Sequence, residues 1–157
     1  MHTFKDFYRN KVTLSFDDHP FARHPKHVWV ICLYGDQWLL TRHKDRGLEF
    51  PGGKVEDKER PEDAAVREVW EETGGVTESI VYIGQYIVAG KGGTIVKNVY
   101  MAIVQDLIPQ KTYYETHGPI LLETIPKNVK HRASYSFIMK DDVLPRCLHY
   151  VNTHIRN

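Results

Sequence analysis

Apolar residues gather in two short runs in the first third of the chain. Residues 27–34 (HVWVICLY) are mostly β-branched or aromatic, Gly35-Asp36 follows them, and residues 38–41 (WLLT) are apolar again. This pattern is typical of a strand, a tight turn and a second strand. The stretch LEFPGG at 48–53 then ends regular structure, because a proline is followed by two glycines. We therefore expect a hairpin and, after it, a loop with accessible backbone.

A second pair of apolar runs lies further along the chain. Residues 80–88 (IVYIGQYIV) and 94–104 (TIVKNVYMAIV) flank the sequence Gly90-Lys91-Gly92-Gly93. Because β-branched and aromatic residues stand on both sides of a glycine-rich turn, these runs predict another strand pair.

Between the two hairpins, the spacing predicts a helix over 61–73. Pro61 suits a first turn, Glu62 and Asp63 complement the positive end of the helix dipole, and Gly74-Gly75 provide a stop. At about 100° per residue, one arc of this helix is mainly apolar and the opposite arc mainly ionic. The first arc contains Ala65, Val66, Val69, Trp70 and Thr73, and the second contains Ala64, Arg67, Glu68, Glu71 and Glu72. We expect the first arc to pack against the sheet.

The end of the chain has the spacing of an amphipathic helix. After Asp142, the residues Leu144, Leu148, Val151 and Ile155 are separated by 4, 3 and 4 positions. The order β-β-α-β-β-α implies an α/β fold, an α/β/α sandwich with a mixed β-sheet between helices. At 157 residues with 41% hydrophobic content, the whole chain, 1–157, is expected to form a single domain.

Charge and cysteine content narrow the class of protein. The formal net charge is +1 from 21 basic and 20 acidic residues, which indicates neither a nucleic-acid groove nor an anionic membrane surface. Cys32 and Cys147 lie far apart with no metal-binding pattern, so both are expected to be buried, reduced thiols. The segment MHTFKDFYRNK does not resemble a secretory signal, and no stretch approaches the roughly 20 apolar residues of a membrane span. These features predict a cytoplasmic protein without a membrane partner and leave the oligomeric state open.

Three carboxylates stand out on the predicted helix. Glu68, Glu71 and Glu72 are spaced i, i+3 and i+4, which places them on one helix face. Adjacent carboxylates repel one another unless a cation lies among them, and hard divalent metals such as Mg²⁺ prefer such oxygen ligands. The alternative is a solvated helix face on which Arg67 and Glu71 form an ordinary i, i+4 pair.

The residues around these carboxylates favour a functional site. The segment follows the pattern Gly, five residues, Glu, seven residues, Arg-Glu, aliphatic, any, Glu-Glu, any, Gly. Its fixed positions are Gly53, Glu59, Arg67, Glu68, Val69, Glu71, Glu72 and Gly74. This is the Nudix box, and the chain resembles the Nudix hydrolases, which split nucleoside diphosphates linked to another moiety. Gly75 departs from the aliphatic residue that ends the box, Val76 follows it as a substitute for packing, and either glycine suits a left-handed cap.

Longer stretches make the resemblance more specific. LEFPGGKVE and LLTRH look like the MutT branch, the 8-oxo-dGTP diphosphatases. SFDDHPF, PKHVWVIC, KNVY and SFIMKD are similar to the bacterial YtkD-type members of that branch. The resemblance therefore spans nearly the whole chain.

The resemblance implies a site dependent on Mg²⁺ or Mn²⁺. Its implied ligands are the Glu68, Glu71 and Glu72 carboxylates and the Gly53 carbonyl, with Glu59 and Arg67 holding them from behind. A further acid is expected from a loop beyond the second strand pair. Glu115, in YYETHGP, is preferred to Glu123 and Asp106 because it lies in a loop before Gly118-Pro119. The general base is left open between Glu68 and Glu115.

Contacts to the rest of the substrate are less marked in the sequence. Arg42 resembles the phosphate-contacting arginine of MutT proteins, and a guanidinium suits phosphate oxygens, although exposed arginines are common. His43, Lys44 and Arg46 either extend a positive rim or only solubilise the loop. For the base, aromatic residues near the hairpins and Asp141 near the last helix are the candidates.

The implied activity is the metal-dependent hydrolysis of a nucleoside triphosphate to a monophosphate and pyrophosphate, with oxidised purine nucleotides such as 8-oxo-dGTP as substrates. One alternative is removal of pyrophosphate from RNA 5′ ends, for which KNVKHR at 127–132 offers phosphate contacts. Another is a nucleotide-binding module without catalysis. The complete set of box glutamates argues against such a module.

Overall fold

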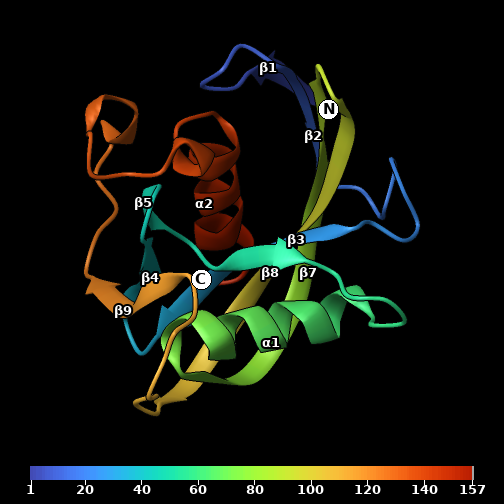
Figure 1. Ribbon diagram of the computed structural model, residues 1–157. Coiled ribbons are helices and arrows are strands. Elements are labelled where there is room, and N and C mark those ends of the chain that lie inside the picture. Colours follow the sequence, from blue (N-terminus) through green and yellow to red (C-terminus); the bar gives the residue numbers. More distant parts are fainter. Residues whose placement is uncertain (157) are drawn as a thin grey trace.

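One nine-stranded mixed sheet forms the centre of the molecule, with helix α1 on one face and helix α2 on the other (Figure 1). The computed structural model describes residues 1–156. The strands are β1 (His2–Lys5), β2 (Lys11–Ser15), β3 (His27–Tyr34), β4 (Gln37–His43), β5 (Gly47–Glu49), β6 (Gly52–Lys54), β7 (Gly75–Gly90), β8 (Gly93–Leu107) and β9 (Thr116–Leu122). The helices are α1 (Pro61–Thr73), the 3₁₀ turns η1 (Val129–His131) and η2 (Phe137–Met139), and α2 (Val143–His154). None of these helices, within residues 1–156, has both the length and the apolar character needed to cross a membrane.

Strand β3 shows why the sheet needs a cover on both faces. Its even positions Val28, Val30 and Cys32 belong to the cluster that contains Ala64, Ala65 and Val69 of α1. Its odd positions Trp29, Ile31 and Leu33 belong to the cluster that contains Leu144, Cys147 and Val151 of α2. Because successive side chains point to opposite faces, an unbroken apolar strand must be buried on both sides. The predicted mixed sheet between helices is confirmed, and both cysteines are buried and free.

The two predicted hairpins are present, and the strands are longer than the apolar runs. Strands β7 and β8 pair from Gly75 opposite Leu107 to Gly90 opposite Gly93, so Lys91 and Gly92 form the turn. The apolar pattern did not indicate the full length of β7 and β8, because the residues at their ends are partly polar. The part of a strand that extends beyond the core does not need apolar side chains.

Five strands fall outside the predicted set. Two of them, β5 and β6, reduce the loop expected at 48–53 to Phe50 and Pro51. β1 and β2 form an N-terminal hairpin on the β7 edge, and β6 pairs with β3. β9 pairs with β4, so Gly118 and Pro119 lie in a strand, whereas Glu115 lies in the turn just before it, as expected. Short or glycine-containing strands of this kind are set by pairing with a neighbour more than by their own pattern.

Helix α1 has the predicted bounds. Gly74 takes the left-handed cap at φ 74°, and its N–H donates to the Trp70 carbonyl at 2.9 Å. Gly75 begins β7, and a Cβ there would lie 2.9 Å from Thr73 Oγ1 and 3.0 Å from Val69 Cγ1. An aliphatic residue at position 75 would therefore crowd the helix exit.

The predicted packing face of α1 is partly wrong. Val66 and Trp70 are exposed, whereas Ala64 and Glu72 are buried. The helix is rotated toward its ionic arc because the β3–β6 side of the sheet lies beneath Glu68 and Glu72.

Helix α2 follows Asp142, as the spacing predicts, and buries Leu144, Cys147 and Val151. Asp142 makes no side-chain cap. Instead, the Asp141 carboxylate accepts from the Val143 N–H at 2.9 Å.

Candidate active site

Gly52 and Gly53 of β6 lie directly beneath the acidic face of α1. Gly52 donates its N–H to Glu72 Oε2 at 3.0 Å. The Glu68 carboxylate covers Gly53, where an added Cβ would be 2.6 Å from Oε1 and 2.7 Å from Cδ. A side chain at position 53 would therefore displace the Glu68 carboxylate from its place over the backbone.

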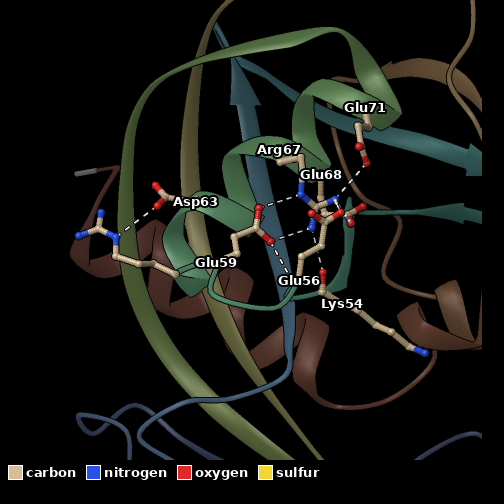
Figure 2. Close-up of polar contacts among 8 residues, drawn as sticks. Lys54, Glu56, Glu59, Asp63, Arg67, Glu68 and Glu71 are labelled. Atoms are coloured by element: carbon tan, nitrogen blue, oxygen red, sulfur yellow. Dashed lines mark hydrogen bonds and ion pairs between the residues drawn. The ribbon is translucent and has the colours of Figure 1, made fainter.

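Arg67 is the centre of a charge network on the same helix (Figure 2). Its Nε and Nη2 donate to the two oxygens of Glu59 at 2.8 and 2.9 Å. Its Nη1 donates to Glu68 at 2.9 Å and to Glu71 at 3.1 Å, and Nη2 also donates to the Lys54 carbonyl at 2.9 Å. One guanidinium therefore joins the loop after β6 to two of the box carboxylates.

The carboxylates of this face carry an unfavourable charge distribution. Burial, opposed by the Arg67 charge and reinforced by Glu71 and Glu115, raises the pKa of Glu68 to about 7. Burial and the Glu68 charge raise the pKa of Glu72 well above its usual range. The Glu59 pKa is lowered instead, because Arg67 donates to its ionised form. A cation bound beside Glu68 and Glu72 would favour their ionised forms.

Carboxylate oxygens held on a rigid helix are suitable ligands for a hard divalent ion, so the residues present fit such a metal. Glu68, Glu71, Glu72 and the Gly53 backbone are the groups that would hold it. Within residues 1–156, no three His, Cys, Asp or Glu side chains are gathered closely enough to hold an ion as they stand. Arg67 holds Glu68 and Glu71, so a metal would compete with this arginine for their oxygens.

A cavity of about 660 Å³ opens over these carboxylates, which is within the usual size of a ligand site. Its acidic lining residues are Glu49, Glu68, Glu71, Glu72 and Glu115, and its basic ones are His27, Arg46, Lys54 and Lys97. Apolar and aromatic parts of the wall come from Val28, Trp29, Tyr113, Tyr114 and Ile138. The cavity thus brings several carboxylates and several basic side chains together.

Glu115 lines this cavity just before β9, and its role as a fourth acid stays a prediction. Its rivals Glu123 and Asp106 are exposed and do not line the cavity.

The predicted phosphate and base contacts are placed differently. Arg42 is exposed on β4 and does not line the cavity, whereas Arg46 does. Asp141 is buried outside the main cavity and lines a smaller neighbouring one. Residues 127–131 line a separate groove beside α2.

Several lining residues gave no recognisable signal in the sequence. Glu49, 2% exposed, accepts from Arg46 Nε at 2.9 Å and from Nη2 at 3.2 Å. Trp29 and Lys97 belong to apolar strand patterns, and Tyr113 precedes the preferred acid. The pairing of β3 with β8, which sets Trp29 opposite Val99 and His27 opposite Lys97, brings distant residues together. Only a lone charge inside an apolar run, as at Lys97, could have marked one of them.

The fold and this site define the class of protein. A model of the NUDIX domain matches residues 23–112, and the chain therefore belongs to the Nudix family. It is a Nudix hydrolase, a class that uses a divalent metal and acts on nucleotide substrates.

More specific likenesses confirm the resemblance seen in the sequence. The chain is 57% identical over 145 residues to a Bacillus subtilis protein named "Putative 8-oxo-dGTP diphosphatase YtkD", covering 92% of both chains. It is 54% identical to the crystal structure of the B. subtilis pyrophosphohydrolase BsRppH, with a TM-score of 0.96 and coverage of 98% of this chain and 97% of that one. A NUDIX hydrolase from Nitrosomonas europaea, at 21% identity and a TM-score of 0.66, shares the fold.

Proposed function

We propose that the chain hydrolyses nucleoside 5′-triphosphates to the monophosphate and pyrophosphate in a reaction that depends on Mg²⁺ or Mn²⁺, and that oxidised purine nucleotides such as 8-oxo-dGTP are substrates. The observation that carries this proposal is the convergence of four carboxylates, Glu68, Glu71, Glu72 and Glu115, with three cations in one cavity. A triphosphate brings several negative charges that such cations would neutralise.

The protein's own groups have separate tasks in this scheme. Arg46, held by Glu49, and Lys54 and Lys97 would bind phosphate oxygens. Glu68 or Glu115 would accept the proton of the attacking water. When bound, a divalent ion supplies positive charge against the phosphates and lowers the pKa of water.

A smaller cavity beside the main one is the proposed base site. It measures about 190 Å³ and shares Lys97 and Ile138 with the main cavity. Tyr86 and Phe137 give it aromatic walls, and Asp141 lies at its edge with a pKa raised to about 7 by burial. Aromatic walls with a carboxyl group suit the face and the edge of a purine.

The test is release of pyrophosphate from 8-oxo-dGTP and dGTP in Mg²⁺ and, separately, Mn²⁺. We expect metal-dependent turnover and a higher kcat/KM for the oxidised nucleotide. Equal or lower kcat/KM for 8-oxo-dGTP would remove the sanitising role, and absence of hydrolysis across a nucleotide panel would overturn the proposed activity.

RNA 5′ ends are the second candidate substrate, supported by the 54% identity to a pyrophosphohydrolase, BsRppH, over nearly the whole chain. The cavity of the proposed base site is open enough to admit an RNA end, because exposed residues such as Tyr8 and Ile95 form part of its wall. Pyrophosphate release from a short triphosphorylated RNA, compared with 8-oxo-dGTP at equal enzyme concentration, would separate the two. A larger kcat/KM for RNA would make RNA the main substrate.

A further inference from the structure

His43 lies at the point where the cavity rim changes from strand to turn. It is the last residue of β4, 8% exposed, and it follows an irregularity in the β4–β9 pairing, where it stands opposite Thr116. The next residue, Lys44, donates its N–H to the Glu115 carbonyl at 3.0 Å. The imidazole is therefore fixed between the turn that leads to Arg46 and the segment that carries Glu115.

Hydrogen bonds at one ring nitrogen set the tautomer of the neutral imidazole. The N–H groups of Asp45 and Arg46 lie 3.1 and 3.2 Å from Nδ1. Both groups are donors, so Nδ1 must accept and cannot carry a proton. In the neutral imidazole the proton is therefore on Nε2.

The other ring nitrogen faces the acid at the cavity rim. Nε2 is 3.7 Å from Glu115 Oε2, which is beyond hydrogen-bond distance, and within residues 1–156 that carboxylate has no other close polar partner. The Glu115 side chain is otherwise 85% exposed, so a small rotation would bring it within hydrogen-bond distance of the N–H. An exposed side chain without such a partner would sample many rotamers.

We propose that His43 is a positioning residue for Glu115. Its Nδ1 shapes the turn that carries Arg46 into the cavity, and its Nε2–H directs the Glu115 carboxylate toward the box glutamates. One buried ring thus sets both a phosphate-binding cation and the fourth acid. The proposal rests on the proposed function insofar as Glu115 takes part in metal binding there.

Two substitutions separate the two sides of the ring. In H43N the amide oxygen takes the place of Nδ1 and accepts from the turn, but nothing replaces Nε2–H. In H43Q the amide N–H takes the place of Nε2–H, but the acceptor for the turn is lost. E115Q removes the carboxylate, and E123Q, at an exposed acid outside the cavity, is the matched control.

The main readout is Mn²⁺ affinity of the full chain, measured by EPR of free Mn²⁺ without substrate. We expect H43N and E115Q each to weaken Mn²⁺ binding by roughly 10-fold or more, the usual range for groups behind a ligand being about 10 to 100-fold. H43Q should retain wild-type affinity and raise the nucleotide KM instead. The H43N effect should vanish in the E115Q background, and E123Q should match the wild type.

Three results would overturn the proposal: wild-type Mn²⁺ affinity in H43N, equal losses in H43N and H43Q, or additive losses in the H43N/E115Q double variant. If the substituted chains do not fold, ¹⁵N NMR of labelled histidines in the wild type decides. A protonated Nδ1 on His43 would contradict it, and an unprotonated Nδ1 would support it. These measurements do not require turnover, so a wrong substrate leaves them interpretable.

Discussion

Two regions of the cavity hold carboxylates in opposite ways. The box region, from Gly52 through α1, buries Glu72 and most of Glu68 and binds Glu68 and Glu71 to one arginine, Arg67. The rim region, from β4, β5 and the start of β9, leaves Glu115 exposed at 85% beside a buried histidine. Burial of charge is costly in the box region, whereas in the rim region Glu115 stays hydrated and the buried Glu49 is paired with Arg46. The carboxylates of the box region are therefore held under electrostatic strain. The exposed Glu115 of the rim region depends instead on a neighbouring side chain to hold its position.

The largest effect should come from neutralising a buried box carboxylate. We expect Glu68→Gln or Glu72→Gln to lower kcat by on the order of 10² to 10⁴-fold, the range for loss of an acid or base. Because the amide removes a buried charge, the midpoint of thermal unfolding should stay equal or rise. Steady-state kinetics and calorimetry measure the two quantities. Glu78→Gln, at an exposed position of β7, is the control. A large loss of stability would show that these carboxylates are structural.

The next effect tests the close contact between β6 and helix α1. Gly53→Ala places a methyl group where Glu68 oxygens lie 2.6 and 2.9 Å away. Displacement of this carboxylate should lower kcat by about 10 to 100-fold, as for a misplaced ligand. Gly92→Ala, where a Cβ meets nothing within 4 Å, should leave activity unchanged. Equal activity of the two variants would mean that Glu68 need not sit over Gly53.

Arg67 offers a test of stability in the box region. Arg67→Lys keeps the charge but loses the planar fork that contacts Glu59, Glu68 and Lys54. Because Arg67 is largely buried, we expect a loss of about 2 kcal/mol, below the 3 to 5 kcal/mol typical of a broken buried pair. Urea unfolding measures it. Arg60→Lys, in an exposed pair, should change stability by less than about 0.5 kcal/mol.

Arg46 and Arg42 give the corresponding test in the rim region. Arg46→Gln should raise the KM for nucleotide about tenfold, near the 1.4 kcal/mol of one charge-assisted contact. Arg42→Gln should have little effect, since its side chain is exposed away from the cavity. A larger effect at Arg42 would restore the sequence-based choice of phosphate contact.

The last comparison concerns the orientation of α1 on the sheet, and its smallest effect is expected at Val66. Val69→Ala removes two buried methyl groups and should cost about 2 kcal/mol. Val66→Ala, at a position 38% exposed, should cost less than about 1 kcal/mol. Denaturant unfolding of both variants checks the rotation of the helix. Equal losses would favour the packing arc predicted from periodicity.

The predictability of the two regions follows from their connectivity. The box residues from Gly53 to Gly74 lie within one short strand, one loop and one helix, so their spacing alone brings them together. The rim residues lie on or next to three strands. Glu115 comes close to β4 only because β9, which begins at the next residue, pairs with β4. Arg42 and Arg46 are four positions apart, but of the two it is Arg46 that lines the cavity. The turn that His43 shapes lies between them and accounts for this difference.

The packing of α1 shows a further limit of periodicity. Hydrophobicity favours an arc through Val66 and Trp70, yet Glu72 is buried because the Gly52 N–H provides a hydrogen bond for its carboxylate. A charged residue at a buried position needs a hydrogen-bond partner, and here the partner lies 20 residues away in the sequence. Functional sites are where such exceptions to patterning occur.

By itself, the sequence determined the strand and helix order of the core, the bounds of α1 and the box that defines the chain as a Nudix hydrolase, because these depend on local spacing. Only the tertiary structure decided which arginine faces the cavity, that Glu49, Trp29 and Lys97 line it, and that Asp141 borders a neighbouring cavity. The physical reason is strand pairing, which joins residues far apart in the chain and chooses, one residue at a time, which side chains face the substrate.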